Sequence, residues 1–187
     1  MGLKIKVEQM LDELLEAGKQ RRASIPYSEN EGMEQMLVFV GPHGEIETKA
    51  MTWDDDREKW AKMRAVSKVA GELGCAAMAM ISDTRWTKSD KFGEYFHLPP
   101  ISEIGLEKWR DEYHTILKGI YGGSIKNLPR ELWTEAVLTV IKGPGIPCQS
   151  RMAAYIEGPN DSIQFIETEQ QMQHDKTMFN LIPDWWV

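Results

Sequence analysis

Hydrophobic residues recur at helical spacing in three parts of the chain, and a glycine follows each part. The first pattern, from Val7 to Leu15, predicts a helix that Gly18 ends, because glycine readily adopts the left-handed conformation that closes helices. The second pattern follows three aspartates and stops at Gly74. The third precedes Gly122 and is the most regular amphipathic pattern, with apolar positions at Leu106, Trp109, Tyr113, Ile116, Leu117 and Ile120.

Short apolar or alternating runs predict strands between and after these helices. Residues 36–40 and 46–53 flank the turn sequence GPHGE and predict a hairpin. The run CAAMAMIS at 75–82 has no alternation, which is typical of a central strand buried on both faces. A helix separates 46–53 from 75–82, so these two strands are expected to be parallel neighbours or near neighbours in one sheet. Further strands are predicted at 135–142, 151–158 and 162–169, and a short helical turn at 127–133.

The order of elements is helix, hairpin, helix, strand, helix and three strands, which predicts an α+β fold. We expect one mixed β-sheet of about six strands with three main helices. Residues 1–30 are interpreted as an N-terminal helix and an exposed linker, an arm that packs on the domain or on a second subunit. Residues 31–187 are interpreted as a single α+β domain with an aromatic C-terminal tail, which ends in DWWV.

The composition narrows the function classes. A net charge of −7 and a pI of about 5.2 argue against general binding of duplex nucleic acid, although they leave room for a local basic patch. The sequence has no apolar run of about 18 residues, so no membrane span is expected. Two cysteines, Cys75 and Cys148, are too few for a disulfide framework, and a reduced, cytoplasmic protein is the simplest interpretation.

The segment 83–100 is unusually rich in rings and cations, and it is predicted to be a loop leaving the buried strand 75–82. One interpretation is that its rings fold back over the end of the sheet. The other is that they contact a ligand or a partner, because ligand crevices tend to lie beyond the carboxyl ends of parallel strands. On that hypothesis an anionic or planar ligand contacts Arg85, Trp86, Lys88, Lys91, Tyr95 and His97.

A second candidate lies at 142–151, in the sequence KGPGIPCQSR. Gly143 and Gly145 free the backbone to turn N–H groups toward an anion, and Lys142 and Arg151 add positive charge. The phosphate-binding P-loop pattern is absent, and a long hairpin loop is the simpler interpretation. Cys148 in the same segment is a candidate nucleophile, although no sequence-adjacent base accompanies it.

No metal or cofactor is expected. The aspartates 54–56 precede a helix, where carboxylates act as caps and stabilise the helix dipole, and they lack the spacing of a calcium loop. The four histidines, His43, His97, His114 and His174, form no pair with metal-ligand spacing, and no Cys-x-x-Cys joins them.

The block from Trp53 to Trp86 carries a resemblance. It follows a hairpin and contains an acidic helix start and a strand ending in Ser-acidic-x-x-Trp, here SDTRW. This order resembles a group of uncharacterised small α+β proteins of bacteria and phages, and the resemblance implies no particular activity. The order of elements is also similar to the zinc deaminase fold. DDDRE and PPISEIG stand where that fold places its ligand motifs, so the metal ligands are missing and its chemistry does not follow.

Three hypotheses for function follow. The first is a non-enzymatic binding protein, such as a phage-type accessory or counter-defence factor that captures a small anionic ligand or a protein partner. The second is a hydrolase-like enzyme that uses Cys148, His97 and the aspartates 54–56. The third is an oligomeric structural or assembly protein. A homo-oligomer is expected in the first and third cases, because the N-terminal helix and the DWWV tail offer apolar contacts.

Overall fold

A computed structural model describes residues 6–29, 33–52 and 56–166, with Asp56 and Arg57 described for the backbone alone. The larger helices are α1 (Val7–Ala23), α2 (Asp56–Glu72), α3 (Ser89–Phe96) and α5 (Leu106–Tyr121), and α4 (Ile101–Ile104) is a single turn. The strands are β1 (Gln35–Val40), β2 (Ile46–Met51), β3 (Ala77–Thr87), β4 (Trp133–Gly143), β5 (Ile146–Glu157) and β6 (Ile163–Phe165). Three 3-10 turns are η1 (Ile125–Asn127), η2 (Arg130–Leu132) and η3 (Pro159–Asp161).

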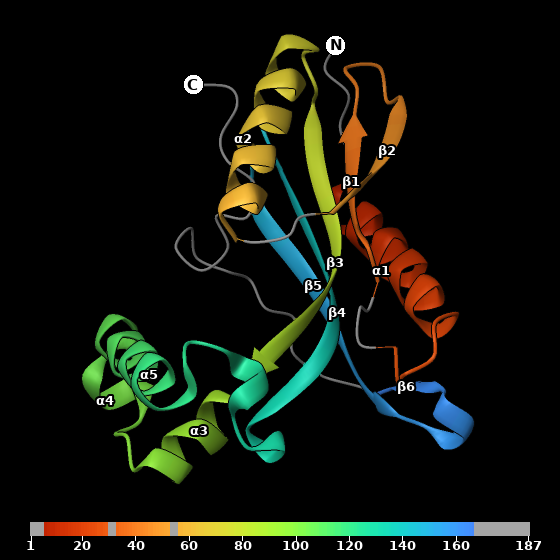
Figure 1. Cartoon of the computed structure of the whole chain (residues 1–187). Helices are drawn as coiled ribbons and strands as arrows, with labels where there is room; N and C mark the ends of the chain where they lie inside the picture. Colours follow the sequence, from red (N-terminus) through yellow and green to blue (C-terminus); the bar gives the residue numbers. More distant parts are fainter. Residues whose placement is uncertain (1–5, 30–32, 53–55, 167–187) are drawn as a thin grey trace. The chain divides into compact units, whose positions relative to one another are not determined.

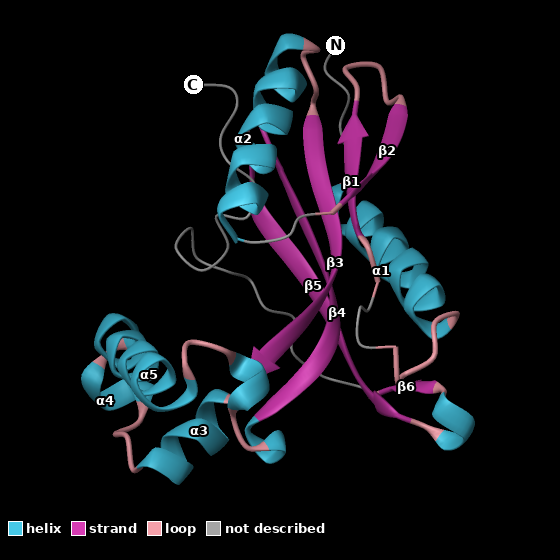
Figure 2. Ribbon diagram, viewed as in Figure 1, coloured by secondary structure: helices cyan, strands magenta, loops and turns pink. Residues whose placement is uncertain are grey.

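The six strands form one sheet in the order β2-β1-β3-β4-β5-β6 (Figures 1 and 2). The α+β class and the single six-stranded sheet are therefore confirmed. β1 pairs antiparallel with both β2 and β3, and β5 pairs antiparallel with β6. Because β1 lies between them, β2 and β3 run parallel as near neighbours. This is the second of the two arrangements that the strand–helix–strand order predicts.

The chain divides into two compact units. One unit comprises residues 1–83 and 137–187 and is called the sheet unit below. The other comprises residues 84–136 and is called the helical unit. β3 and β4 each pass from the sheet unit into the helical unit, so the helical unit is an insertion between two strands of the sheet.

The sheet unit has a core on each face of its sheet. Successive side chains of a strand point to opposite faces, and β3 follows this rule closely. Ala77, Ala79 and Ile81 pack with Leu11 of α1, whereas Met78 and Met80 pack with α2 residues. The helices α1 and α2 therefore cover opposite faces. Cys75 is buried in the α2 core, as its apolar sequence context predicts.

The N-terminal helix packs on the sheet, which was one of the two placements expected for it. Leu11 is fully buried in the core, and α1 contacts β5 and β6. Gly18 does not end this helix, which continues to Ala23. A Cβ at Gly18 would lie 2.7 Å from Cγ1 of Val137 and 2.8 Å from Cγ2 of Ile81, so glycine is there for close packing. The linker predicted to follow is helical up to Ala23, and its Arg22 is buried.

The helical unit has a core of its own, made largely of rings. Trp109 and Tyr113 of α5 stack with centroids 5.7 Å apart and planes 9° from parallel. Phe92 of α3 is fully buried against both of these rings. The remaining buried members of this core come from the end of α5 and from the segment after it: Leu117, Leu128, Leu132 and Trp133. The amphipathic helix predicted at 106–121 is confirmed.

Both predicted loops are wrong. Residues 83–87 extend β3 and residues 89–96 form α3, in which Phe92 and Phe96 have the i, i+4 spacing that brings side chains together on one helix face. Most of residues 142–151 belong to β4 and β5, which are joined by a tight turn at Pro144 and Gly145. The interpretation of that segment as a hairpin was therefore correct, but not as a long loop.

Two further predictions involve segments that lie only partly within the described residues. Of the last predicted strand, 162–169, residues Ile163–Phe165 form β6, whereas residues 167–169 and the DWWV tail lie outside the described residues. Asp54 and Asp55 also lie outside them. None of the helices in the described ranges combines the length and the hydropathy needed to cross a membrane.

Candidate anion-binding site

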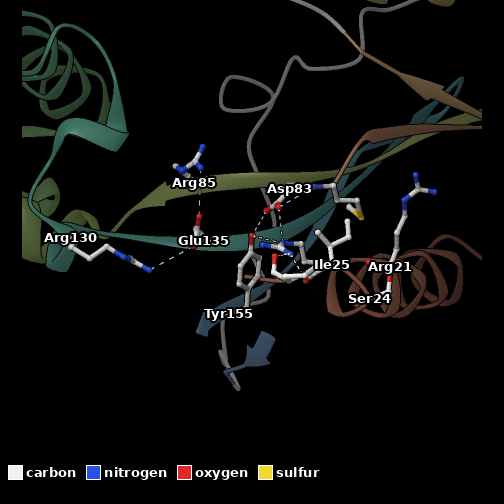
Figure 3. A network of polar contacts seen from close by, with 11 residues as sticks. Arg21, Ser24, Ile25, Asp83, Arg85, Arg130, Glu135 and Tyr155 are labelled. Carbon is white, nitrogen blue, oxygen red and sulfur yellow. Dashed lines mark hydrogen bonds and ion pairs between the residues drawn. The ribbon is translucent and has the colours of Figure 1, made fainter. Parts of the chain in front are cut away.

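Two arginines of the helical unit share one glutamate. Arg85 comes from β3, Glu135 from β4 and Arg130 from η2 (Figure 3). Nη2 of Arg85 lies 3.7 Å from Oε1 of Glu135, and Nη2 of Arg130 lies 3.8 Å from Oε2. Both separations exceed hydrogen-bond length, so these are ion pairs without a bidentate fork. One carboxylate thus offsets the charge of two guanidinium groups only in part.

The ring of Trp133 supports both arginines. The guanidinium carbon of Arg130 lies 4.2 Å from the centroid of the Trp133 ring, and that of Arg85 lies 5.8 Å from it. Arg130 also donates a hydrogen bond of 2.9 Å to the carbonyl oxygen of Trp133. The Nε atom of Arg85 is buried and has no hydrogen-bond partner. Cation–π contact with Trp133 therefore helps to hold both guanidinium groups in place.

Two lysines extend the positive charge of this group. The backbone N–H of Lys88 donates to the carbonyl oxygen of Leu132 at 2.8 Å, which ties the start of α3 to η2 and brings Lys88 toward Arg130. The pKa of the Lys88 ammonium is lowered by partial burial first, and then by the charges of Lys91 and Arg130. Neither lysine forms an ion pair with any residue in the described ranges. We name Arg85, Lys88, Lys91 and Arg130 the cationic cluster.

The helical unit also contains a groove of about 750 Å³ beside α3 and α4. Its walls include Leu98, Pro99, Pro100, Ile101 and Trp109, and its polar lining includes Ser89, Asp90, Glu94, His97, Ser102 and Glu103. We name it the acidic groove. His97 caps α3 in the left-handed conformation, with φ of 55°, and lies in this groove. His97 thus lines the groove with Asp90 and Glu94, whereas Lys88 and Lys91 do not line it.

The remaining predicted residues of 83–100 lie nearby in the sequence but differ in surroundings. Tyr95 is 50% exposed on α3, with its ring 4.9 Å from that of Phe96. Trp86 is half-buried on β3. Of the six residues predicted in this segment, Lys88 lies close enough to Lys91 and to Arg130 for their charges to interact, and Arg85 shares Glu135 with Arg130. Tyr95 follows Lys91 by one helical turn. Ligand binding by these residues stays a prediction.

The second predicted group, at 142–151, has contacts of its own within the sheet unit. Arg151 pairs with α1: its Nη2 pairs with Glu8, and its Nε lies 3.4 Å from Oδ1 of Asp12. A Cβ at Gly143 would lie 2.5 Å from the carbonyl oxygen of Ala76, so Gly143 serves close strand packing. Gly145, with φ of 72°, forms the tight turn, and Lys142 lies on β4 before it. Anion binding by this group stays a prediction.

The sheet unit contains a buried polar network that the sequence did not suggest. Asp83 on β3 accepts a hydrogen bond of 2.5 Å from the hydroxyl of Tyr155 on β5 and lies 3.0 Å from Nε of Arg22 (Figure 3). Arg22 also donates to the Tyr155 hydroxyl at 3.0 Å and to the carbonyl oxygen of Ile25 at 3.0 Å. Burial, and then the bond to Asp83, raise the pKa of Tyr155. This network joins α1 to the sheet.

The residues of the hydrolase hypothesis lie in different parts of the chain. Cys148 is on β5 of the sheet unit, packed against the α2 core, and His97 is on the helical unit. Asp54 and Asp55 are outside the described residues, and the side chain of Asp56 is undescribed. Within the described ranges, no three His, Cys, Asp or Glu side chains gather in a way that could hold a metal. The hydrolase hypothesis remains a prediction.

Three members of the site escaped the sequence analysis: Arg130, Trp133 and Glu135. They lie in the stretch RELWTE, which the hydrophobic pattern assigns to a helical turn and a strand start. A signal was available, because an arginine near a tryptophan can place its guanidinium over the face of the ring. What could not be read was that β3 brings Arg85 beside them.

No family model matches the chain, and no curated protein matches it.

Proposed function

We propose that the protein is a non-enzymatic binding protein whose helical unit captures an anionic ligand at the cationic cluster. The observation that carries this proposal is the grouping of four cations in the helical unit. Arg85 and Arg130 share the carboxylate of Glu135, and Lys88, tied to η2 through its backbone, lies close enough to Arg130 and Lys91 for their charges to act on it. The chain as a whole has a net charge of −7, so a local group of cations would attract an anion to this one place and not to the surface in general.

The surroundings of the cluster favour an anion. Removing the Lys88 ammonium from water and placing it near two other cations disfavours its charged form, as its lowered pKa reflects. An anion bound there would offset both effects. The guanidinium groups are held by Trp133, so less side-chain entropy is lost when they donate to a ligand. An anion that accepts several hydrogen bonds, such as a phosphate group, matches these donors best.

The test is a calorimetric titration of inorganic tripolyphosphate at low ionic strength. The native protein is expected to bind with an affinity that falls steeply as salt is added, because the contacts are ionic. The double variant Lys88→Gln/Lys91→Gln is expected to lose at least about tenfold in affinity, a change of about 1.4 kcal/mol. Lys108→Gln, which removes an exposed lysine of α5, is the matched control and is expected to bind like the native protein. Equal binding by both variants would refute the proposal.

The acidic groove supports a second candidate, capture of a protein partner. Its apolar walls suit an apolar side chain, and Asp90, Glu94 and Glu103 suit a flanking lysine or arginine. A peptide library that varies in charge distinguishes this function. Basic peptides that the native protein retains and Glu94→Gln/Glu103→Gln does not would support it, whereas equal retention of both would exclude the groove. An oligomeric assembly role remains the third hypothesis, tested by light scattering over a range of concentrations.

A further inference from the structure

We infer that the ligand of the cationic cluster is a small nucleotide, or an equally compact phosphate ester of a flat ring. This inference rests on the proposed function and refines it. The first observation is the position of Tyr95, which is not a member of the cationic cluster. Tyr95 follows Lys91 by four residues on α3, so these two side chains lie on one side of the helix. Lys88 precedes the helix as its N-cap residue and is close enough to Lys91 for their charges to interact.

Tyr95 is suited to stack on a planar group. Half of its surface is exposed, and the edge-on contact with Phe96, with planes 64° apart, leaves a ring face uncovered by that neighbour. The ring centroid of Phe96 in turn lies 4.6 Å from that of the fully buried Phe92. Tyr95 is therefore connected through Phe96 to the ring core of the helical unit. A base stacked on such a ring typically contributes about 1–3 kcal/mol without regard to base identity.

The spacing along α3 fits a ring joined to a phosphate. Four residues of helix span about 6 Å, so Tyr95 lies one turn from Lys91 and about two turns from Lys88. A ligand whose flat ring covers Tyr95 can therefore place a phosphate chain along Lys91 and Lys88 toward Arg130. The hydrogen bond from the N–H of Lys88 to the carbonyl oxygen of Leu132 holds Lys88 next to η2.

Acidic charge on α3 limits the size of the ligand. Asp90 and Glu94 are exposed on the part of α3 that lines the acidic groove with Glu103, and Glu94 lies one helical turn from Lys91. A polyanionic strand that wrapped around the helix would meet these carboxylates, whereas a single nucleotide covers only the Lys88–Tyr95 side. The inference is therefore restricted to mononucleotides and similar small esters, in keeping with the acidic character of the whole chain.

The test compares ATP with inorganic tripolyphosphate on the full chain, in the absence of divalent metal. Tripolyphosphate carries at least as much charge as ATP, so charge alone predicts that it binds at least as tightly. We expect the reverse, with ATP tighter by about tenfold because of stacking. Tyr95→Ala is expected to remove that advantage and leave tripolyphosphate binding unchanged, and Tyr95→Phe, which keeps the ring, to restore it.

The outcomes separate this inference from the function on which it rests. If tripolyphosphate binds and requires Lys88 and Lys91, but ATP binds no tighter or Tyr95→Ala has no effect, the anion site stands and the nucleotide inference is overturned. If an eight-residue single-stranded oligonucleotide binds more tightly than ATP, the restriction to small ligands is overturned. If neither ATP nor tripolyphosphate binds, the proposed function and the inference both fall. Circular dichroism of each variant verifies that it is folded.

Discussion

Arg22 is buried in the sheet unit with 2% of its surface exposed, and it owes this position to Asp83 and Tyr155. A buried charge is tolerated only when it is paired and hydrogen-bonded, and here carbonyl oxygens of the chain after α1 complete the set. The sequence placed Arg22 in an exposed linker, since an arginine among polar residues ordinarily indicates solvent. Asp83 and Tyr155 are more than 60 positions away in the sequence, so no local pattern could have revealed them.

Tyr155 makes stability depend on pH in the alkaline range. Burial raises its pKa above the ordinary value of about 10, so near pH 11 the unfolded chain has released a proton that the folded protein retains. Stability contributed by this group is present below pH 10 and is lost as the pH rises. Between pH 8 and pH 11 the native protein is expected to lose about 1 kcal/mol through Tyr155.

Urea unfolding at several pH values measures this effect. Tyr155→Phe is expected to be less stable than the native protein at pH 8 by about 1–3 kcal/mol, because Asp83 loses a donor in a buried site. It is also expected to lose less stability than the native protein as the pH rises to 11. Tyr95→Phe, at a half-exposed position, serves as the control. A Tyr155→Phe curve parallel to the native one would contradict the assignment.

Replacing Glu135 is expected to strengthen anion binding, whereas most replacements in a binding site weaken it. Its carboxylate offsets the charges of Arg85 and Arg130 and competes with any anion for them. Glu135→Gln is therefore expected to strengthen tripolyphosphate binding about fivefold or more, since one unit charge at 4 Å is worth about 1 kcal/mol even in water. Glu131→Gln is the matched control on the neighbouring turn. Weaker binding by Glu135→Gln would show that the carboxylate organises the site instead of opposing the ligand.

At the scale of elements, α3 combines three different faces in eight residues. Phe92 and Phe96 face the ring core, Lys91 lies on a second side, and Asp90 and Glu94 line the groove on a third. The composition of this segment was visible in the sequence, but its period was not recognised, because so short a helix offers only two buried positions. The prediction of a loop failed for that reason, while the contact of its cations with an anionic ligand stays a prediction.

Two glycine-to-alanine substitutions, one in α1 and one in α5, test how closely α1 packs on the sheet. Replacing a mid-helix glycine by alanine ordinarily stabilises a protein by up to about 1 kcal/mol. Gly119→Ala in α5 is expected to do so, because nothing lies within 4 Å of the added Cβ. Gly18→Ala is expected to destabilise by about 1–3 kcal/mol, because its Cβ would overlap Val137 and Ile81. Thermal unfolding of the two variants provides the measurement, and stabilisation by both would contradict the close approach of α1.

At the scale of the whole molecule, the sequence predicted most elements of the sheet unit and missed the division into two units. Helical and alternating patterns are local, so α1, α2, α5 and the strands could be recognised from them. The division depends on β3 and β4 each continuing into residues 84–136, and these extensions carry no unusual pattern. The same limit applies to the candidate site, which joins β3, α3, η2 and β4.

Binding of an anion by residues 85–91 and 130–135 of the helical unit can be measured directly. Tripolyphosphate is titrated into the ¹⁵N-labelled chain, and the chemical shifts of the backbone amides are followed. We expect saturable changes in chemical shift at Arg85, Lys88, Lys91 and Arg130 and their neighbours, with the amides of Asp12 and Arg151 unmoved. Shifts centred on the acidic groove or on the sheet unit, or no shifts at saturating tripolyphosphate, would contradict it.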